Sequence, residues 1–322
     1  MSKVKSREES RVLFLTFGQD TNFLNGLEAA AKRLEYQALA SKQFTDVIRL
    51  DFNSIKLLPN FELIEPILSS ENWGFGYFVW KPFILNWALT ELGPLYDYVI
   101  YADAGCELQS NPTKIRHFHR LLRELETQPC LAYFTELPEI LMTKSNVLTI
   151  LENESDKFRG SIEATYILFK SDSGAQLFVR EWLRICTKDN FESLMPVQNE
   201  SDGTVKLQLH CYDQSIFSVI YKNHFKRFLT PIRPKVLKNG KIGMLEEFIY
   251  GSNFIWPIRN RSAQTRLNKL LNISAISELS VCLFRVYRIV RRAKQKIDPR
   301  SRENKILQLL IPYREAGFIS ER

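Results

Sequence analysis

A carboxylate, Asp103, follows directly on a run of strand-forming residues. The run, residues 98–102, is rich in β-branched and aromatic residues and comes after the turn pair Gly93-Pro94, so we expect a buried strand with Asp103 at its carboxyl end. Ligands bind at this edge of open α/β sheets, where a carboxylate can bind a divalent cation or a ribose hydroxyl and Gly105 lets a ligand approach the backbone. The alternative is a strand end followed by a turn whose aspartate caps the next element.

A loop rich in glycine and aromatic residues, Gly74–Pro82, carries a lysine just before its proline. The rings of Tyr77 and Trp80 need a protein partner or a ligand to cover them. Pro82 is typical of a first helical turn, and Lys81 adds positive charge to the expected helix N-terminus, where phosphate groups bind. The sequence predicts either a pyrophosphate site or a loop that packs its aromatic residues over the sheet and leaves the lysine in solvent.

A third polar block runs from His210 to Ser215, just before an apolar helix expected at residues 216–221. Asp213 at the start of that helix, with Gln214 in the first turn, is ordinary capping chemistry. The same carboxylate can instead orient or deprotonate a hydroxyl group of a substrate.

An alternating β/α pattern must position these groups. We expect further strands at residues 11–17, 46–51, 130–134 and 160–169, and helices at 25–40, 83–92, 114–126 and 175–186. This alternation predicts a mostly parallel sheet flanked by helices. Thr16 and Phe17 end the first strand, where a nucleotide base or ribose would bind, although a plain strand-to-helix turn fits equally well. The chain has no GxGxxG or Walker pattern, which disfavours dinucleotide oxidoreductases and P-loop ATPases.

The three blocks Gly74–Pro82, Tyr98–Glu107 and His210–Ser215 resemble a group of bacterial-type glycosyltransferases with a GT-A fold. That family combines a GYWxWKP-like loop, a YxDxG strand end and a later DQS segment, and the resemblance extends over residues 11–228. It implies a GT-A-like α/β catalytic domain, which we place at residues 11–255. Such a domain would move a sugar from a nucleotide-sugar donor, in the first instance a UDP-sugar, to a glycan or lipid-linked acceptor in surface polysaccharide or lipopolysaccharide synthesis.

The resemblance also implies roles for individual residues. The residues implied to bind the donor are Thr16, Phe17, Tyr77, Trp80, Lys81, Asp103, Gly105 and Gln214. Asp213 and Glu163 are the catalytic candidates, Glu163 because the loop before its strand commonly faces the sugar or acceptor in GT-A enzymes. A polar residue on a half-exposed strand is the alternative for Glu163. Lys144 is either a second charge on a phosphate or acceptor, or an exposed lysine without a role.

The same resemblance also implies a metal site. The GT-A metal motif is Asp-x-Asp, but Gly105 takes the place of the second aspartate. Asp103 and His210 would then bind Mn²⁺ or Mg²⁺, and a single carboxylate makes a weaker site for either ion. A zinc site at Cys106, His117 and His119 is disfavoured, because there is no CxxC pair and the two histidines would point to different sides of a helix.

The composition fits an enzyme-sized globular protein. With 322 residues, of which 45% are hydrophobic and 12% aromatic, the chain can bury a large core. Its five cysteines are scattered and odd in number, which favours buried free thiols. The charged residues 1–10, expected to be flexible, lead into an apolar stretch too short for a signal peptide or a membrane span, which predicts a cytoplasmic protein.

The C-terminal residues 256–322 are expected to form a basic helical appendage that holds much of the net charge of +8. Arginine and lysine alternate there with apolar residues, so the helix would either lie on the anionic inner face of a membrane or pack on the catalytic domain. No nucleic-acid fold signature is present, and we expect no nucleic-acid partner.

Two other classes of function compete with sugar transfer. The missing second carboxylate leaves open a non-catalytic protein that binds a nucleotide sugar or acts as a membrane-surface scaffold. A nucleotidyltransferase shares the α/β sheet but usually has a glycine-rich basic loop near the first strand, which this sequence lacks.

Overall fold

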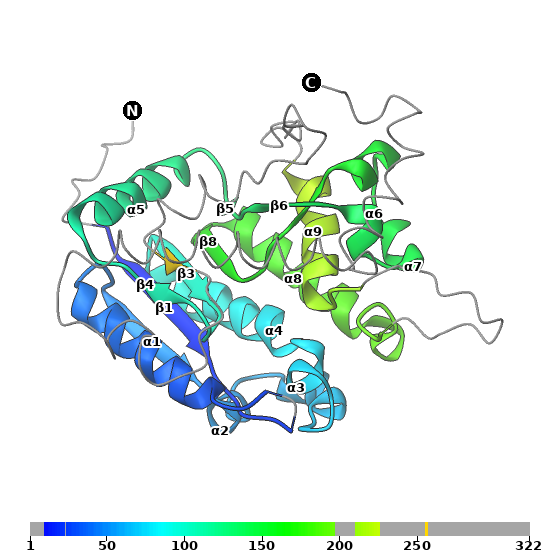
Figure 1. The fold of residues 1–322 in the computed structure, drawn as a ribbon, viewed down its shortest axis with the longest axis horizontal. Coiled ribbons are helices and arrows are strands. Elements are labelled where there is room, and N and C mark those ends of the chain that lie inside the picture. The colour runs from blue at the N-terminus through cyan, green and yellow to red at the C-terminus, as the bar shows by residue number, and fades with distance from the viewer. Residues whose placement is uncertain (1–9, 23, 197–209, 226–254, 257–322) are drawn as a thin grey trace, which may run out of the picture. The chain divides into compact units, whose positions relative to one another are not determined.

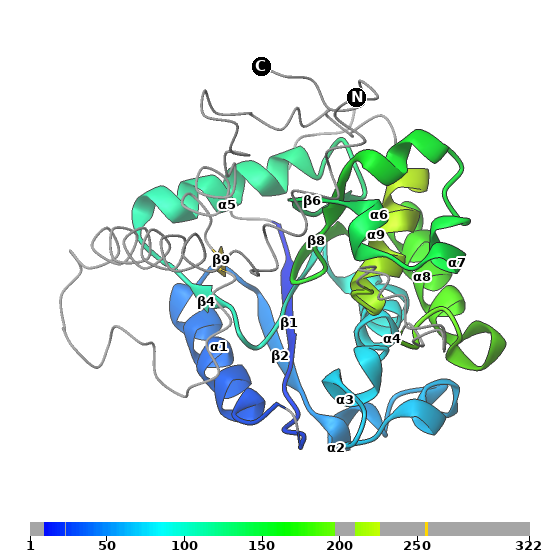
Figure 2. The same cartoon turned by 45° about the vertical axis from the view of Figure 1, so that its right-hand side comes forward.

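The computed structural model describes residues 10–22, 24–196, 210–225 and 255–256, which all belong to one compact unit of the chain. Within this unit a central sheet lies between two layers of helices (Figures 1 and 2). The layers follow from the alternating β/α pattern of the sequence, because each helix buries one apolar face against the sheet.

Five strands form the central sheet in the order β2-β1-β3-β8-β5. They are β1 (Val12–Phe17), β2 (Asp46–Leu50), β3 (Tyr98–Ala102), β5 (Cys130–Leu131) and β8 (Tyr166–Lys170). β1 pairs in parallel with β2 and β3, while β8 runs antiparallel to both of its neighbours, β3 and β5. All strands but β8 therefore run the same way, and the predicted mostly parallel α/β sheet is confirmed.

Helices cover both faces of the sheet. The long ones are α1 (Leu27–Ser41), α4 (Trp80–Trp87), α5 (Pro112–Glu124), α8 (Ser173–Phe191) and α9 (Asp213–His224). Leu13 and Leu15 of β1 belong to the core under α4, α8 and α9, whereas Val12 and Phe14 belong to the core under α1 and α5. All six residues of β1 are buried for this reason, and the strand reads as a continuous apolar run.

Shorter elements connect these layers. The helical ones are α2 (Phe52–Ile55), α3 (Gly74–Tyr77), α6 (Glu139–Met142), α7 (Ser145–Leu148), the 3₁₀ turns Phe61–Leu63, Glu65–Ile67, Gly93–Leu95 and Glu154–Phe158, and a π turn at Ala88–Leu92. The short strands are β4 (Glu107–Leu108), β6 (Phe134–Pro138), β7 (Gly160–Ile162) and β9 (Ile255–Trp256). β4 pairs with β9 and β6 pairs with β7, both antiparallel.

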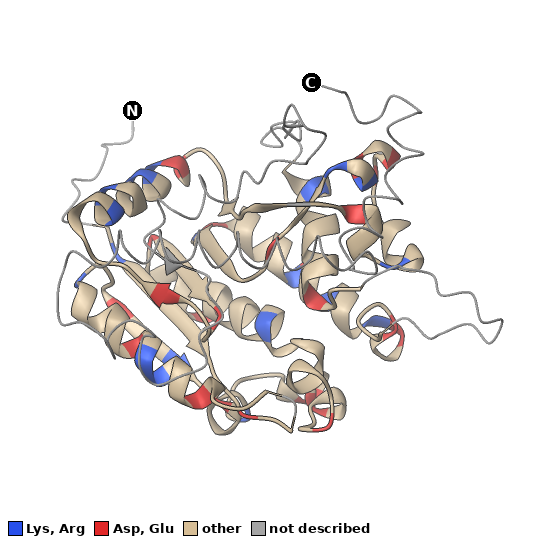
Figure 3. Cartoon of the chain, in the orientation of Figure 1, with Lys and Arg blue, Asp and Glu red and all other residues tan. Residues whose placement is uncertain are grey.

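Side-chain caps define where two of the long helices begin. Asn111 accepts a hydrogen bond from the backbone N–H of Lys114 at the start of α5, and Asp172 does the same for Ala175 at the start of α8. Each cap satisfies a backbone donor that the helix itself leaves without a partner. The basic positions along α5 are coloured blue on the ribbon in Figure 3.

Two elements differ from the sequence-based expectation in a way that shapes the site. The single strand expected at residues 160–169 is divided into β7 and β8, because β7 pairs with β6 while β8 joins the central sheet. The break at residues 163–165 brings backbone carbonyls to the carboxyl end of β3. Helix α4 begins at Trp80 rather than at Phe83, so Lys81 is a residue of its first turn.

Several predictions fall on residues that the structure does not describe. These are the flexible N-terminus, apart from Ser10, and the basic helical appendage at 256–322, of which only Trp256 in β9 is described. Across the described ranges, no helix is both long enough and apolar enough to span a bilayer. Cys106, Cys130 and Cys186 are buried free thiols, and the Cys211 side chain is half-buried.

Candidate active site

The three sequence blocks meet at the carboxyl ends of β1 and β3. β1 lies between β2 and β3. The chain therefore leaves β1 to form β2 on one side of it and comes back to form β3 on the other side. This is a topological switch point, where open α/β sheets bind their ligands. Asp103 directly follows β3 at this edge, next to Thr16 and Phe17 at the end of β1.

The Asp103 carboxylate is a half-buried acidic group that keeps accessible surface. Its Oδ1 atom accepts a hydrogen bond from the Tyr101 hydroxyl at 2.5 Å and lies 3.1 Å from the Lys81 Nζ atom. The side chain is 30% exposed, and none of the described contacts involves its Oδ2 atom. Burial raises the pKa of Tyr101 well above its usual value, and the Asp103 charge adds to this. Tyr101 therefore stays protonated and remains a hydrogen-bond donor.

Lys81 lies between two carboxylates. Its Nζ atom is 3.1 Å from Asp103 Oδ1 and 3.2 Å from Asp213 Oδ2, and it donates a hydrogen bond to the Ala164 carbonyl oxygen at 3.1 Å. The rings of Phe78, Trp80 and Tyr101 lie 5.5 to 5.8 Å from the same atom, within cation–π range. Burial lowers the pKa of Lys81, but the two carboxylates outweigh it and the net shift is upward, so Lys81 is an ammonium ion at neutral pH.

This position differs from the pyrophosphate contact expected for Lys81. The residue is only 3% exposed, because the first turn of α4 directs the side chain under the sheet edge toward Asp103 and Asp213. An ammonium ion with two carboxylate partners has little positive potential left for a phosphate. Lys81 fixes the acidic groups instead.

Asp213 is the first residue of α9 and is only 2% exposed. It does not cap the helix, since Tyr212 is the N-cap residue and makes no side-chain capping bond. The Trp182 indole N–H donates to the Asp213 carbonyl oxygen at 3.0 Å. Oδ2 makes its charge contact with Lys81 but has no well-aligned hydrogen bond among the described residues. Burial raises the pKa of Asp213 to about 7, against the lowering effect of Lys81.

Arg33 on α1 holds the turn that carries Asp103, and the sequence analysis missed it. Its Nη2 atom donates to the carbonyl oxygens of Ala104 and Cys106 at 3.1 and 2.8 Å. The Cys106 backbone N–H donates to the Asp103 carbonyl oxygen, which closes the turn, and half-buried Gly105 lies within it. An arginine in an amphipathic helix looks like a surface residue, so no local sequence signal marks this contact.

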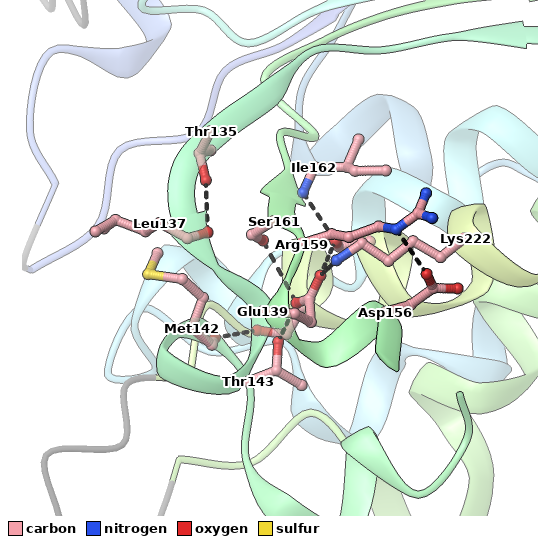
Figure 4. Close-up of polar contacts among 12 residues, drawn as sticks. Thr135, Leu137, Glu139, Met142, Thr143, Asp156, Arg159, Ser161, Ile162 and Lys222 are labelled. Carbon is pink, nitrogen blue, oxygen red and sulfur yellow. Dashed lines mark hydrogen bonds and ion pairs between the residues drawn. The ribbon is translucent and has the colours of Figure 1, made fainter. Parts of the chain in front are cut away.

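A buried polar cluster fixes the far end of α9 (Figure 4). Glu139 on α6 pairs with Lys222, and both side chains are fully buried. The Glu139 carboxylate also accepts hydrogen bonds from the hydroxyl groups of Thr143, which ends α6, Ser161 in β7 and Ser218 in α9. A buried ion pair is tolerated only where hydrogen bonds satisfy the remaining lone pairs, and this cluster meets that requirement.

The near end of α9 is attached to the same helix, α6. The Ser215 hydroxyl donates to the Met142 carbonyl oxygen at 2.7 Å and accepts a hydrogen bond from the Cys211 N–H at 2.8 Å. Gln214 is half-buried, and its N–H donates to the Cys211 carbonyl oxygen. Asp213 is therefore held between an anchored helix start and the Trp182 side chain.

Two of the predicted donor-binding side chains, Phe17 and Trp80, lie in the core. Their rings stack at 4.0 Å, both are buried, and the Trp80 indole N–H donates to the Gly74 carbonyl oxygen. Thr16 is fully buried, and its hydroxyl has no hydrogen-bond partner in the described part of the chain. Tyr77 is half-buried and is the predicted aromatic contact that keeps an accessible surface.

Glu163 lies close to the same acidic edge. Its backbone N–H donates to the Tyr133 carbonyl oxygen, and its side chain is half-buried. Burial raises the pKa of the Cys106 thiol well above its usual value, and the charges of Asp103 and Glu163 both add to the rise. The two carboxylates therefore both lie within electrostatic range of one buried thiol.

The described ranges do not bring Asp103 and His210 together with a third metal-ligating side chain. The His210 Nε2–H group donates a hydrogen bond to the Ser193 carbonyl oxygen. Burial, together with the Lys144 charge, lowers the pKa of His210 to about 3. Asp103 Oδ1 is occupied by Tyr101 and Lys81. No group of three or more His, Cys, Asp or Glu side chains within the described ranges is arranged around a common point, and we derive no step through a metal.

Lys144 is likewise engaged by the protein itself. Its Nζ atom donates to the carbonyl oxygens of Glu192 and Met195. Burial lowers the pKa of Lys144 to about 8, which the Glu192 charge partly opposes. The side chain therefore holds the turn after α8 rather than a phosphate.

Comparison with known proteins gives matches in structure alone. No family model and no curated protein matches this sequence. The chain is similar to mouse xyloside xylosyltransferase 1 in its apo form, with 13% identity and a TM-score of 0.37 over 67% of this chain and 82% of that one. It is similar to the apo bifunctional glycosyltransferase WbbM with the same identity and TM-score, over 69% of this chain and 38% of that one. Similarity at this level carries no argument about activity, so the function is argued from the site.

Proposed function

We propose that this chain is a glycosyltransferase that moves a sugar from a nucleotide-sugar donor to a hydroxyl group of an acceptor. The observation that carries the proposal is the buried Lys81 ammonium ion, which joins Asp103 and Asp213 from separate blocks of the sequence at the switch point of the sheet. Positioned carboxylates at a ligand-binding edge are the groups that orient sugar hydroxyls and accept their protons.

In this proposal Asp103 is the carboxylate that touches the substrate. Its Oδ2 atom faces no described protein partner, while Tyr101 and Lys81 fix the orientation of the group through Oδ1. The acceptor oxygen attacks the anomeric carbon, the bond to the diphosphate breaks, and the acceptor proton moves to Asp103 or to the nearby Glu163. Holding the reactants in line supplies much of the rate enhancement.

Asp213 has a different role from the acceptor base expected from the sequence. It is too deeply buried to reach an acceptor, and it acts on the site through Lys81. We propose that Asp213 is a positioning residue, which keeps the ammonium ion in contact with Asp103.

The test is a panel of UDP-, GDP-, ADP- and CMP-sugars, with binding measured by calorimetry and turnover by release of the nucleotide. Asp103→Asn is expected to keep the fold and to lower turnover at least ~100-fold, the usual effect of losing a general base. Asp189→Asn, at an exposed aspartate, is the matched control. Turnover that stays near normal in Asp103→Asn removes Asp103 from the reaction, and binding without turnover supports a non-catalytic nucleotide-sugar-binding protein.

The nucleotide-release assay also tests whether turnover depends on a metal ion. Since the described donor set does not suit Mn²⁺ or Mg²⁺, turnover is expected to persist in excess chelator. Loss of turnover that either ion restores would mean that a metal ligand comes from the substrate or from residues outside the described ranges.

The proposal also names the class of acceptor and the place where the protein would meet it. We infer a glycan or lipid-linked acceptor of surface polysaccharide or lipopolysaccharide synthesis, with a UDP-sugar as the first donor to test. The basic segment within residues 256–322 would hold the protein at an anionic membrane surface. Removing that segment should weaken sedimentation with anionic liposomes, and unchanged sedimentation would reject the membrane contact.

A further inference from the structure

A half-buried group of aromatic side chains, Tyr77, Phe78 and Tyr212, lies beside the ionic site, and we call it the tyrosine platform. The rings of Tyr77 and Tyr212 are 5.1 Å apart at an interplanar angle of 31°, and those of Phe78 and Tyr212 are 6.5 Å apart. All three residues keep accessible surface. The hydroxyl groups of Tyr77 and Tyr212 have no hydrogen-bond partner among the described residues.

The backbone under the platform is strained. The φ angles of the three non-glycine residues Phe75, Tyr77 and Phe78 lie between 53° and 66°, and Tyr212 has φ 53° and ψ −122°. Such backbone conformations are unfavourable for residues with a side chain, and they cluster at ligand-binding sites. The strain turns residues of two distant blocks toward each other and makes the Tyr77–Tyr212 contact.

The platform is continuous with the catalytic groups. The Lys81 Nζ atom is 5.5 Å from the Phe78 ring, and Tyr212 directly precedes Asp213 in the chain. A ligand on the platform therefore lies next to an ionic group made of one ammonium ion and two carboxylates. Such a group disfavours a phosphate as a neighbour and favours the hydroxyl groups of an uncharged ligand.

We propose that the tyrosine platform is a sugar-binding subsite that takes a pyranose ring. This inference rests on the proposed function and adds a substrate contact, Tyr212, that the sequence did not suggest. The apolar C–H face of the pyranose would pack on the aromatic rings, which combine a large apolar surface with a polar hydroxyl group. Its hydroxyl groups would hydrogen-bond to the tyrosine hydroxyls and to Asp103 Oδ2. The ring belongs either to the acceptor or to the donor, and the experiment separates the two.

The decisive variant is Tyr212→Gly. It removes the ring at a position whose positive φ suits glycine, so the fold should not be lost with it, and Tyr212→Phe is the matched control that keeps the ring. The probes are methyl pyranosides of glucose, galactose and mannose, followed by saturation-transfer NMR, and UDP and UDP-glucose, followed by calorimetry. We expect at least one pyranoside to bind about tenfold more weakly to Tyr212→Gly and about threefold more weakly to Tyr212→Phe, which keeps the ring but loses one hydroxyl group.

The outcomes separate the alternatives. Weaker pyranoside binding with unchanged UDP-glucose binding assigns the platform to the acceptor sugar, and weaker binding of UDP-glucose but not of UDP assigns it to the donor sugar. A loss of UDP affinity instead, or no pyranoside binding to the native chain, overturns the proposal. Pyranoside binding that depends on Tyr212, without transfer from any nucleotide sugar, would refute the proposed function and leave the platform standing.

Discussion

Replacing Asp213 by asparagine should make the stability of the protein depend less on pH. Burial raises the pKa of this carboxyl to about 7, from 3.8 in the unfolded chain. Between these values the folded chain binds more protons than the unfolded chain, so the native state loses stability as the pH rises through them. The asparagine side chain is similar in size to the aspartate that it replaces but cannot titrate.

The magnitude follows from the two pKa values. At pH 5 the proton on Asp213 contributes about 3 kcal/mol to the free energy of unfolding, and at pH 8 it contributes close to zero. The free energy of unfolding of Asp213→Asn, minus that of the native chain, should therefore rise by about 3 kcal/mol between pH 5 and pH 8. Other titrating groups largely cancel in this difference.

Urea unfolding at both pH values, at constant ionic strength, measures the effect by linear extrapolation. Asp189→Asn serves as the control, because an exposed side chain should give a difference that hardly changes with pH. A stability difference for Asp213→Asn that stays the same at pH 5 and pH 8, or that falls, would refute the burial of an ionisable Asp213 beside Lys81.

Three further experiments test the packing at and around the site. Lys81→Met should lower the free energy of unfolding by about 3–5 kcal/mol, since it leaves the buried Asp213 without its cation, and adding Asp213→Asn should restore part of the loss in urea unfolding. Lys222→Met and Glu139→Gln break the same buried ion pair, so each single variant should lose more than half of the free energy of unfolding that the double variant loses. A double-mutant cycle with a coupling energy below ~0.5 kcal/mol would mean that the pair contributes little to stability. Gly160→Ala should cost about 1–3 kcal/mol, because its Cβ would lie 2.2 Å from the Thr135 carbonyl oxygen; an unchanged melting temperature would contradict this packing.

The strands and helices were largely predictable because their patterns are local. β1 and β3 are continuous runs of apolar and β-branched residues, and α8 begins at an aspartate that caps it. The division of residues 160–169 into two strands was not predictable, since both halves have strand-forming composition. The break exists because the Ala164 carbonyl accepts from Lys81 and the Thr165 carbonyl accepts from the Asp103 N–H.

The site was predictable in its members but not in their roles. Composition and order drew attention to Lys81, Asp103 and Asp213, and the fold brings both carboxylates within 3.2 Å of the Lys81 Nζ atom. The sequence favoured Lys81 as a phosphate ligand and His210 as a metal ligand. Lys81 is instead buried between the two carboxylates, and His210 bonds to the Ser193 carbonyl oxygen through Nε2.

The sequence by itself determined the alternating α/β class, the strand that ends at Asp103 and the presence of three chemically active blocks. These depend on hydrophobic period and turn chemistry, which act between near neighbours. Only the tertiary structure decided which carboxylate is exposed, that Arg33 holds the Asp103 turn, and that Glu139 pairs with Lys222. Those outcomes depend on contacts between residues far apart in the chain and on burial, which sets the free energy of every charge.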